Sequence, residues 1–176
     1  MKSFKVLLTA FVVGCLSLSS CSNDDTNPND TVPDNMSGTY MLTEFNTGTA
    51  TDLDMDGTPN INQKLESDCY NNSRLVFSAN NTVIYYMNGL ELDPANGTFS
   101  CTSDTFTGTW QIYSGSSTLG TINAVFDING NSTTISLTKE GDEITGYQLF
   151  SEYPDVDENG VGFYNSGEIT MIFVKN

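Results

Sequence analysis

Residues 74–87 read RLVFSANNTVIYYM, and this stretch decides the fold class. Apolar and polar side chains alternate on both sides of the Asn80-Asn81 pair, which is typical of a short turn between two strands. A period of two places every second side chain on the same face of an extended strand. The apolar positions are Leu75 and Phe77 before the turn and Val83, Tyr85 and Met87 after it. The segment therefore predicts a β-hairpin with one buried face.

The same alternation recurs on both sides of this hairpin. Further strands are expected around residues 40–45, 98–102, 107–113, 121–128, 134–138, 144–149 and 169–173, with 98–102 and 107–113 pairing as a hairpin. Helical periodicity is limited to residues 61–67. Eight or nine short strands at regular spacing predict an all-β fold, an antiparallel barrel of eight or nine strands, with a β-sandwich as the alternative.

Charge and composition exclude several classes of function. The 176 residues include 22 Asp and Glu against 6 Lys and Arg, and the formal net charge is -16. Such a chain has no basic surface to displace phosphate counterions, so we expect no nucleic-acid binding. It contains no histidine, the commonest general base. The acid pairs Glu140/Asp142 and Glu152/Asp155 lie in loop-like contexts, so we expect no enzymatic activity.

The first residues are typical of an exported protein. Residues 1–20 contain two lysines, an apolar run and then small residues, which predicts a secretory signal peptide. The segment ending in Ser20-Cys21 resembles the lipobox of bacterial lipoproteins, which implies that Cys21 becomes the lipidated first residue. The alternative is an ordinary signal peptide that Cys21 follows by chance. Residues 21–36 are acidic and poor in apolar side chains, which predicts a flexible linker before a domain at 37–176.

The residues after Cys21 bear on location. Ser22, not an aspartate, follows the cysteine, and Asp24 and Asp25 come shortly after it. In the lipoproteins that this segment resembles, the pattern implies the outer membrane of a Gram-negative bacterium and display on the cell surface. We therefore expect a lipid-anchored, surface-exposed monomer that contacts the membrane through its N-terminal anchor.

Two of the four cysteines remain for a disulfide. Cys15 belongs to the predicted signal peptide, and Cys21 is the predicted lipidation site. In an oxidising, exported location the remaining Cys69 and Cys101 are expected to pair. Without a histidine or a second thiol pair, a catalytic or metal-binding role for these thiols is disfavoured.

One acidic segment has the spacing of a calcium loop. In such loops the carboxylates at positions 1, 3 and 5 converge on the ion, because a glycine at position 6 lets the chain fold back. The candidate ligands are Asp52, Asp54 and Asp56, followed by Gly57, the Thr58 carbonyl and Asn60. Gln63 stands where a bidentate Glu would be, so Glu66 or Asp68 would have to complete the shell. The alternative is a solvated acidic loop.

A second segment repeats this spacing in a weaker form. Asp155, Asp157 and Asn159 precede Gly160, and Ser166 stands at position 12. These residues are a second candidate calcium site. The alternative is a loop that joins the last two strands.

The order of these motifs resembles a known family. A lipobox, a polar linker, a Gly-Thr-Tyr strand, an acidic loop and the segment around residues 71–83 follow one another. Together they resemble the lipocalin-like domain of bacterial surface lipoproteins. The resemblance implies a small antiparallel barrel from about Ser37 to Lys175, with Lys175 packing over Tyr40. Tyr40 stands where the opening tryptophan of that family would be.

Two functions remain open from the sequence. Aromatic residues make up 11% of the chain, so a lipocalin-like barrel that binds a small apolar molecule or a glycan is expected. The same aromatic side chains can instead simply fill the core. The alternative function is a structural or adhesive surface module, without a ligand in the barrel, whose acidic loops are stabilised by Ca²⁺.

Overall fold

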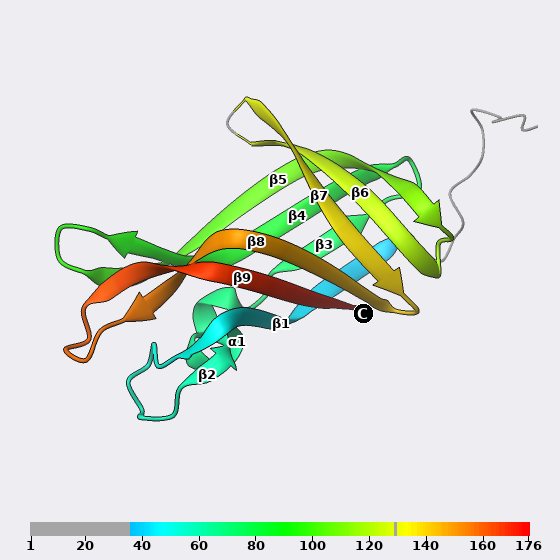
Figure 1. Ribbon diagram of the computed structural model, residues 1–176. Helices are drawn as coiled ribbons and strands as arrows, with labels where there is room; N and C mark the ends of the chain where they lie inside the picture. Colours follow the sequence, from blue (N-terminus) through cyan, green and yellow to red (C-terminus); the bar gives the residue numbers. More distant parts are fainter. Residues whose placement is uncertain (1–35, 129) are drawn as a thin grey trace, which may run out of the picture. The chain divides into compact units, whose positions relative to one another are not determined.

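The computed structural model describes residues 36–128 and 130–176. The described part of the chain holds nine strands, one short α-helix and one 3-10 turn (Figure 1). They are, in chain order, β1 (Gly38–Thr51), β2 (Asn60–Asn62), α1 (Gln63–Glu66), η1 (Asp68–Tyr70), β3 (Arg74–Phe77), β4 (Thr82–Asp93), β5 (Thr98–Gly115), β6 (Leu119–Ile128), β7 (Asn131–Glu140), β8 (Glu143–Val156) and β9 (Gly162–Lys175).

The strands form a closed barrel. All neighbours are antiparallel, in the order β1-β3-β4-β5-β6-β7-β8-β9, and β1 also pairs with β9. β2 lies outside this ring and pairs with the second half of β1. The fold is thus an all-β, eight-stranded antiparallel barrel, as the alternation predicted, and not a sandwich.

The hairpin that decided the fold class is confirmed as β3–β4. Phe77 pairs with Val83 and Leu75 with Tyr85, so the apolar positions face one another on the inner side. The turn holds because Asn81 adopts φ 62°, a left-handed conformation that asparagine tolerates, and the Ser78 amide donates to the Thr82 carbonyl. The helical turn expected at 61–67 is present as α1.

The prediction of a hairpin between residues 98–102 and 107–113 is wrong. Both segments belong to one continuous strand, β5, whose residues 98–109 pair with β4. The turn lies earlier, at the Asp93–Gly97 segment, where the Gly97 amide donates to the Asp93 carbonyl and Gly97 adopts φ 67°. Residues 103–106 contain no glycine or proline, and Thr105 and Phe106 favour an extended strand, so nothing there ends β5.

One end of the barrel is filled by aromatic rings, and we call it the closed end. The Tyr40 and Trp110 rings each meet Phe77 edge-on, with centroids 5.6 Å apart, and all three side chains are buried. Lys139 and Lys175 lie over Tyr40, with Nζ atoms 5.1 and 5.8 Å from the ring centroid. The placement of Lys175 that the resemblance implied is therefore confirmed.

Several predictions fall on the N-terminal residues. The signal peptide at 1–20, the lipidation site Cys21 and the linker up to residue 35 lie outside the described residues. Within the described ranges, no helix is both long and apolar enough to cross a bilayer.

Candidate functional site

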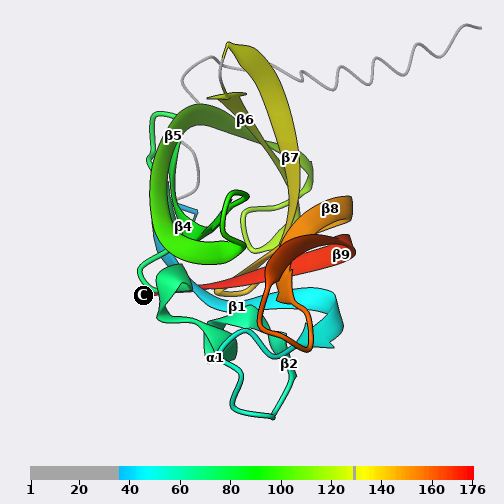
Figure 2. The same ribbon diagram turned by 90° about the vertical axis from the view of Figure 1, so that its left-hand side faces the viewer.

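The barrel contains a cavity of about 520 Å³ at the end opposite Tyr40. We call this the open end. It includes the β4–β5 and β8–β9 turns and the loop between β1 and β2, and it faces the viewer in Figure 2. The cavity is bounded at its deep side by Tyr85, Phe126 and Met171, which are all buried. At the closed end, by contrast, the inward-facing side chains are large enough to contact one another and fill the space between the strands.

The polar groups deep in the cavity wall remain uncharged. Burial raises the pKa of the Tyr85 hydroxyl, which donates to the Met171 Sδ atom at 3.4 Å. Burial also raises the pKa of Tyr70, and the nearby Tyr164 raises it further. The Tyr70 ring stacks on Phe45 with centroids 4.9 Å apart. The Tyr70 hydroxyl oxygen is buried and has no hydrogen-bond partner in the described part of the chain.

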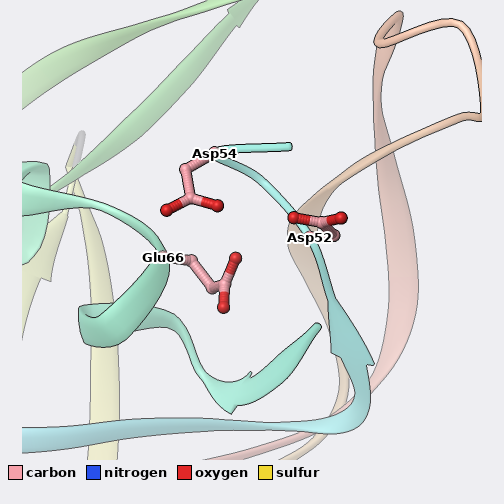
Figure 3. Close-up of side chains that lie close together, drawn as sticks. All are labelled: Asp52, Asp54 and Glu66. Atoms are coloured by element: carbon pink, nitrogen blue, oxygen red, sulfur yellow. The ribbon is translucent and has the colours of Figure 1, made fainter. Parts of the chain in front are cut away.

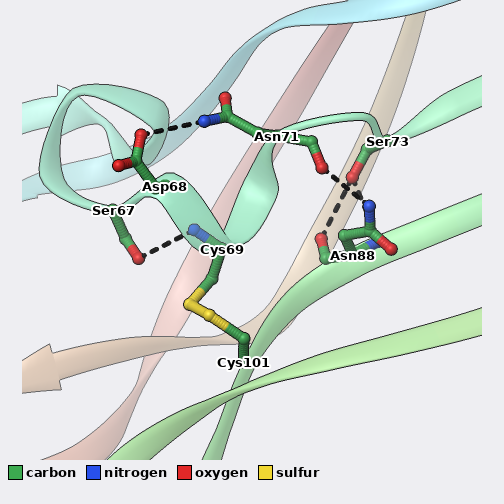
Figure 4. Close-up of a disulfide and its surroundings, with 7 residues drawn as sticks. All are labelled: Ser67, Asp68, Cys69, Asn71, Ser73, Asn88 and Cys101. Carbon is green, nitrogen blue, oxygen red and sulfur yellow. Dashed lines mark hydrogen bonds between the residues drawn. A yellow bond between two sulfur atoms is a disulfide. The ribbon is translucent and has the colours of Figure 1, made fainter.

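A disulfide holds the segment that carries Tyr70 against the barrel. Cys69 of η1 is bonded to Cys101 of β5, with Cα atoms 5.0 Å apart, so the predicted pairing is confirmed (Figure 4). The Ser67 side chain accepts a hydrogen bond from the Cys69 amide and begins the 3-10 turn. On the other side, Asn88 Nδ2 of β4 donates to the Asn71 carbonyl at 2.7 Å. These bonds position Tyr70 as part of the cavity wall.

The acidic loop brings three carboxylates together. Oxygen atoms of Asp52, Asp54 and Glu66 lie within 4.8 Å of one another (Figure 3). Asp52 follows the end of β1, whereas Glu66 is the last residue of α1. Glu66 is 7% exposed, and its Oε2 accepts a hydrogen bond from the Leu53 amide. Burial raises the pKa of Glu66, although the Leu53 amide opposes this, and the neighbouring aspartates raise it further.

Other residues in and beside this loop also make hydrogen bonds within the protein. Asp56 Oδ1 accepts from the Thr58 amide at 2.7 Å, and Asn60 Oδ1 accepts from the Asn62 amide at 3.1 Å. Gln63 is fully buried, and its Nε2 donates to Thr51 Oγ1. Asp68 accepts from Asn71 Nδ2. Of the two acids expected to complete the shell, Glu66 is therefore the one that joins the loop.

The donor set suits a cation. Carboxylate oxygens are the ligands of hard ions such as Ca²⁺ and Mg²⁺, and three like charges this close repel one another without an ion between them. The Asp52 Oδ1 atom is buried and accepts no hydrogen bond from the described residues. A metal ion would satisfy that oxygen and offset the repulsion, so Asp52, Asp54 and Glu66 can hold one.

The second acidic segment forms the β8–β9 turn. Asp157 Oδ1 accepts from the Asn159 and Val161 amides at 2.8 and 2.9 Å, and these bonds lower the pKa of Asp157. Asp155 accepts from Asn165 Nδ2 of β9. Over residues 36–128 and 130–176, the group of three carboxylates close enough to share an ion is the one at Asp52. Residues 157–161 form the loop that joins β8 and β9, and a second calcium site at Asp155, Asp157 and Asn159 stays a prediction.

Comparison with known proteins found no family model, curated protein or solved structure that matches the chain. The site is therefore defined by its geometry. The sequence pointed to aromatic residues such as Tyr85 and Tyr164, which do line the cavity, but it did not distinguish them from Trp110, which fills the closed end. It also missed Met171 and Ile169, whose only signal was their inward position on the last strand.

Proposed function

We propose that this protein is a lipid-anchored surface lipoprotein of an outer membrane whose lipocalin-like barrel binds a small apolar molecule and has no catalytic role. The observation that carries the proposal is the cavity of about 520 Å³ inside the barrel. Small-molecule sites are typically concave, mostly apolar and about 300–1,000 Å³ in volume. An eight-stranded barrel is wide enough to hold one such ligand.

The lining favours an apolar ligand over a glycan, the other ligand expected from the sequence. The deep wall consists of aromatic, aliphatic and thioether groups, such as Phe126, Ile169 and Met171. Burying apolar ligand surface against these groups contributes about 25 cal/mol per Å². At this depth Tyr70 and Tyr85 offer one hydroxyl each, so most hydroxyl groups of a sugar would be left without partners. The anchoring part of the proposal is supported by the sequence around Cys21 alone.

The test uses the full chain with Cys15 and Cys21 replaced by serine, so that no acyl chain can be mistaken for a ligand. Native mass spectrometry is expected to show a stoichiometric adduct that organic extraction removes. Thr133→Trp, at a half-buried position in the cavity wall, should abolish the adduct. Thr138→Trp, at an exposed position of the same strand outside the cavity, should retain it. A fully folded protein that never carries or takes up an apolar molecule would contradict the proposal.

A second candidate function is a calcium-stabilised surface module, and Asp52, Asp54 and Glu66 favour it. Position 12 of the loop is occupied by Gln63, but Glu66 contributes a carboxylate from α1 in its place. With three charged ligands and the remaining sites left to carbonyls and water, Ca²⁺ fits because it accepts six to eight oxygens in flexible geometry. Binding would cross-link the end of β1 to α1.

Thermal unfolding in EDTA and in millimolar Ca²⁺ tests this second function. Ca²⁺ is expected to raise the melting temperature of the unsubstituted protein. It should leave the melting temperature of the Asp52→Asn variant unchanged. Asp104→Asn removes the same charge from an exposed site on β5 and should keep the response. Equal shifts in both variants would mean that Ca²⁺ acts by general screening, which would rule out the site.

A further inference from the structure

The barrel wall is incomplete between β7 and β8. These strands pair only from Leu137 with Gly146 to Glu140 with Glu143. Beyond that point β7 continues to pair with β6 as far as Asn131, and β8 continues to pair with β9 as far as Val156. Figure 1 shows β7 diverging from β8 toward the β6–β7 turn. We call the unpaired edges, residues 131–136 and 147–156, the seam.

The cavity reaches the surface at this seam. Residues from both edges line it, namely Thr133, Thr134, Ile135 and Ser136 on β7 and Tyr147, Gln148, Ser151, Glu152 and Pro154 on β8. Thr134, Ser136, Tyr147 and Glu152 are exposed, whereas Tyr85 and Met171 at the deep side are buried. The cavity therefore runs from the buried core outward to a lateral opening, and a ligand can pass there without separating paired strands.

The chemistry of the lining changes along this path. The deep wall is apolar, while Thr133, Gln148 and Ser151 offer hydroxyl and amide groups at the seam. Glu152 is the one charged side chain among the described residues that line the cavity, and no lysine or arginine is among them. A carboxylate or phosphate held here would face Glu152 with no cation to pair with. The net charge of -16 adds long-range repulsion of anions.

We propose that the seam between β7 and β8 is the entrance to the cavity and selects uncharged amphiphiles, such as long-chain alcohols, over anionic ones such as fatty acids. The apolar chain lies against Tyr85, Phe126 and Met171, and the polar end stays at the seam, where hydroxyl and amide groups bind it. This inference rests on the proposed function and specifies its ligand class and its route of entry.

Selectivity is tested with two ligands of equal chain length, 1-dodecanol and dodecanoate. Displacement of a neutral fluorescent dye from the full chain carrying Cys15→Ser and Cys21→Ser is measured at pH 7.5. The alcohol is expected to bind at least tenfold more tightly than the acid. Glu152→Lys should reduce the ratio of the two affinities by up to about fivefold, because dodecanoate should bind more tightly to the variant. Glu91→Lys, with the same charge change at an exposed residue of β4 outside the cavity, should leave the ratio unchanged.

The entrance is tested by protection of an introduced thiol in the same background. Ser151→Cys places it on the β8 edge of the seam, and Thr138→Cys places a control outside the cavity. Saturating dodecanol should slow the reaction of a bulky maleimide at position 151 at least tenfold and leave position 138 unaffected. The labelled Ser151→Cys protein should no longer bind the dye.

The outcomes separate the two proposals. If dodecanol binds but does not protect the thiol at position 151, the seam is not the entrance. If dodecanol and dodecanoate bind equally tightly, the proposed selectivity for uncharged amphiphiles is wrong. In both cases the proposed binding function stands. If neither ligand nor the dye binds the folded protein, the proposed binding function itself is wrong.

Discussion

The two ends of this barrel are built from the same strands but differ in how their inner positions are filled. At the closed end, Tyr40 and Trp110 each contact Phe77, and all three residues are at most 3% exposed. At the open end the rings of Phe45, Tyr70 and Tyr85 border a cavity of about 520 Å³. The strand ladder continues at the closed end and is interrupted at the seam between β7 and β8.

This difference teaches that dense packing and unfilled space are separated along the barrel axis. Interiors packed without voids resist any loss of volume, whereas a site for a ligand needs space that the protein leaves unfilled. The closed end therefore supplies the packing energy that allows the open end to keep a cavity, a disulfide-held turn and a cluster of carboxylates. Substitutions at the two ends should differ in size and in what they change.

The largest effect is expected from Trp110→Ala at the closed end. Removing a large buried aromatic side chain costs about 3–5 kcal/mol of unfolding free energy, because the rigid surroundings cannot fill the space. Phe106→Ala, at a half-buried position bordering the cavity, should cost less than half as much. Urea denaturation of both variants measures the two losses. Equal losses would show that the two ends are packed alike.

Removal of the disulfide should act mainly at the open end. The link joins residues 32 positions apart, and for such a loop the chain-entropy model gives about 3–4 kcal/mol. The double variant Cys69→Ser with Cys101→Ser should lose up to this amount in urea denaturation. Hydrogen exchange should accelerate around Tyr70 while the amides of Trp110 and Phe77 stay protected. Uniform acceleration along the barrel would contradict the separation of the two ends.

A smaller change in the free energy of unfolding, and in the opposite direction, is expected from Glu66→Gln in the absence of metal. The raised pKa means that the folded state binds the Glu66 proton more tightly than the unfolded chain does. This contribution to stability is present in acid and is lost as pH rises through the raised pKa. Glu66→Gln should therefore gain up to about 1 kcal/mol at pH 7 in EDTA. Chemical denaturation from pH 4 to pH 8 measures it, and a loss of stability in the variant at pH 7 would refute the interpretation.

The smallest effect is expected from Tyr70→Phe. The variant removes a buried hydroxyl that has no partner among the described residues, so stability should stay the same or rise by no more than about 0.5 kcal/mol. Tyr85→Phe is the matched control, since its hydroxyl bonds to Met171, and it should lose a little stability. Thermal unfolding compares the two, and a clear loss in Tyr70→Phe would show that its hydroxyl has a stabilising partner.

The strands were predictable where apolar residues alternate. The hairpins around Asn80-Asn81 and Gly141 follow from local pattern and turn residues, and both are present. The continuity of β5 was missed because residues 102–105 carry no apolar side chain to mark a face. Strand pairing there depends on β4, which supplies partners for residues 98–109 of β5. The local sequence of β5 does not contain this information, because the pairing is determined by the register of a different strand.

The candidate site was less predictable than the fold. The spacing of Asp52 and Asp54 was informative, but the third carboxylate depends on how α1 folds back on the loop, and Glu66 and Asp68 were equal candidates from the sequence. A ligand-binding barrel was expected, but the position of the cavity within it could not be predicted. Tyr85 and Trp110 have the same alternating context, and only the sum of the surrounding side-chain volumes decides which one borders a space.

The pairing of β1 with β9 also determines when the protein can fold. It joins the first and the last strand of the domain, with Tyr40 opposite Lys175. During synthesis, the edge of β1 that faces β9 stays unpaired until β9 has emerged. Ring closure is then among the last events, and folding dominated by such distant contacts is slow, on the order of milliseconds to seconds. Removal of residues 169–176 would delete the whole β1–β9 ladder and leave an open sheet with two exposed edges, which is prone to aggregate.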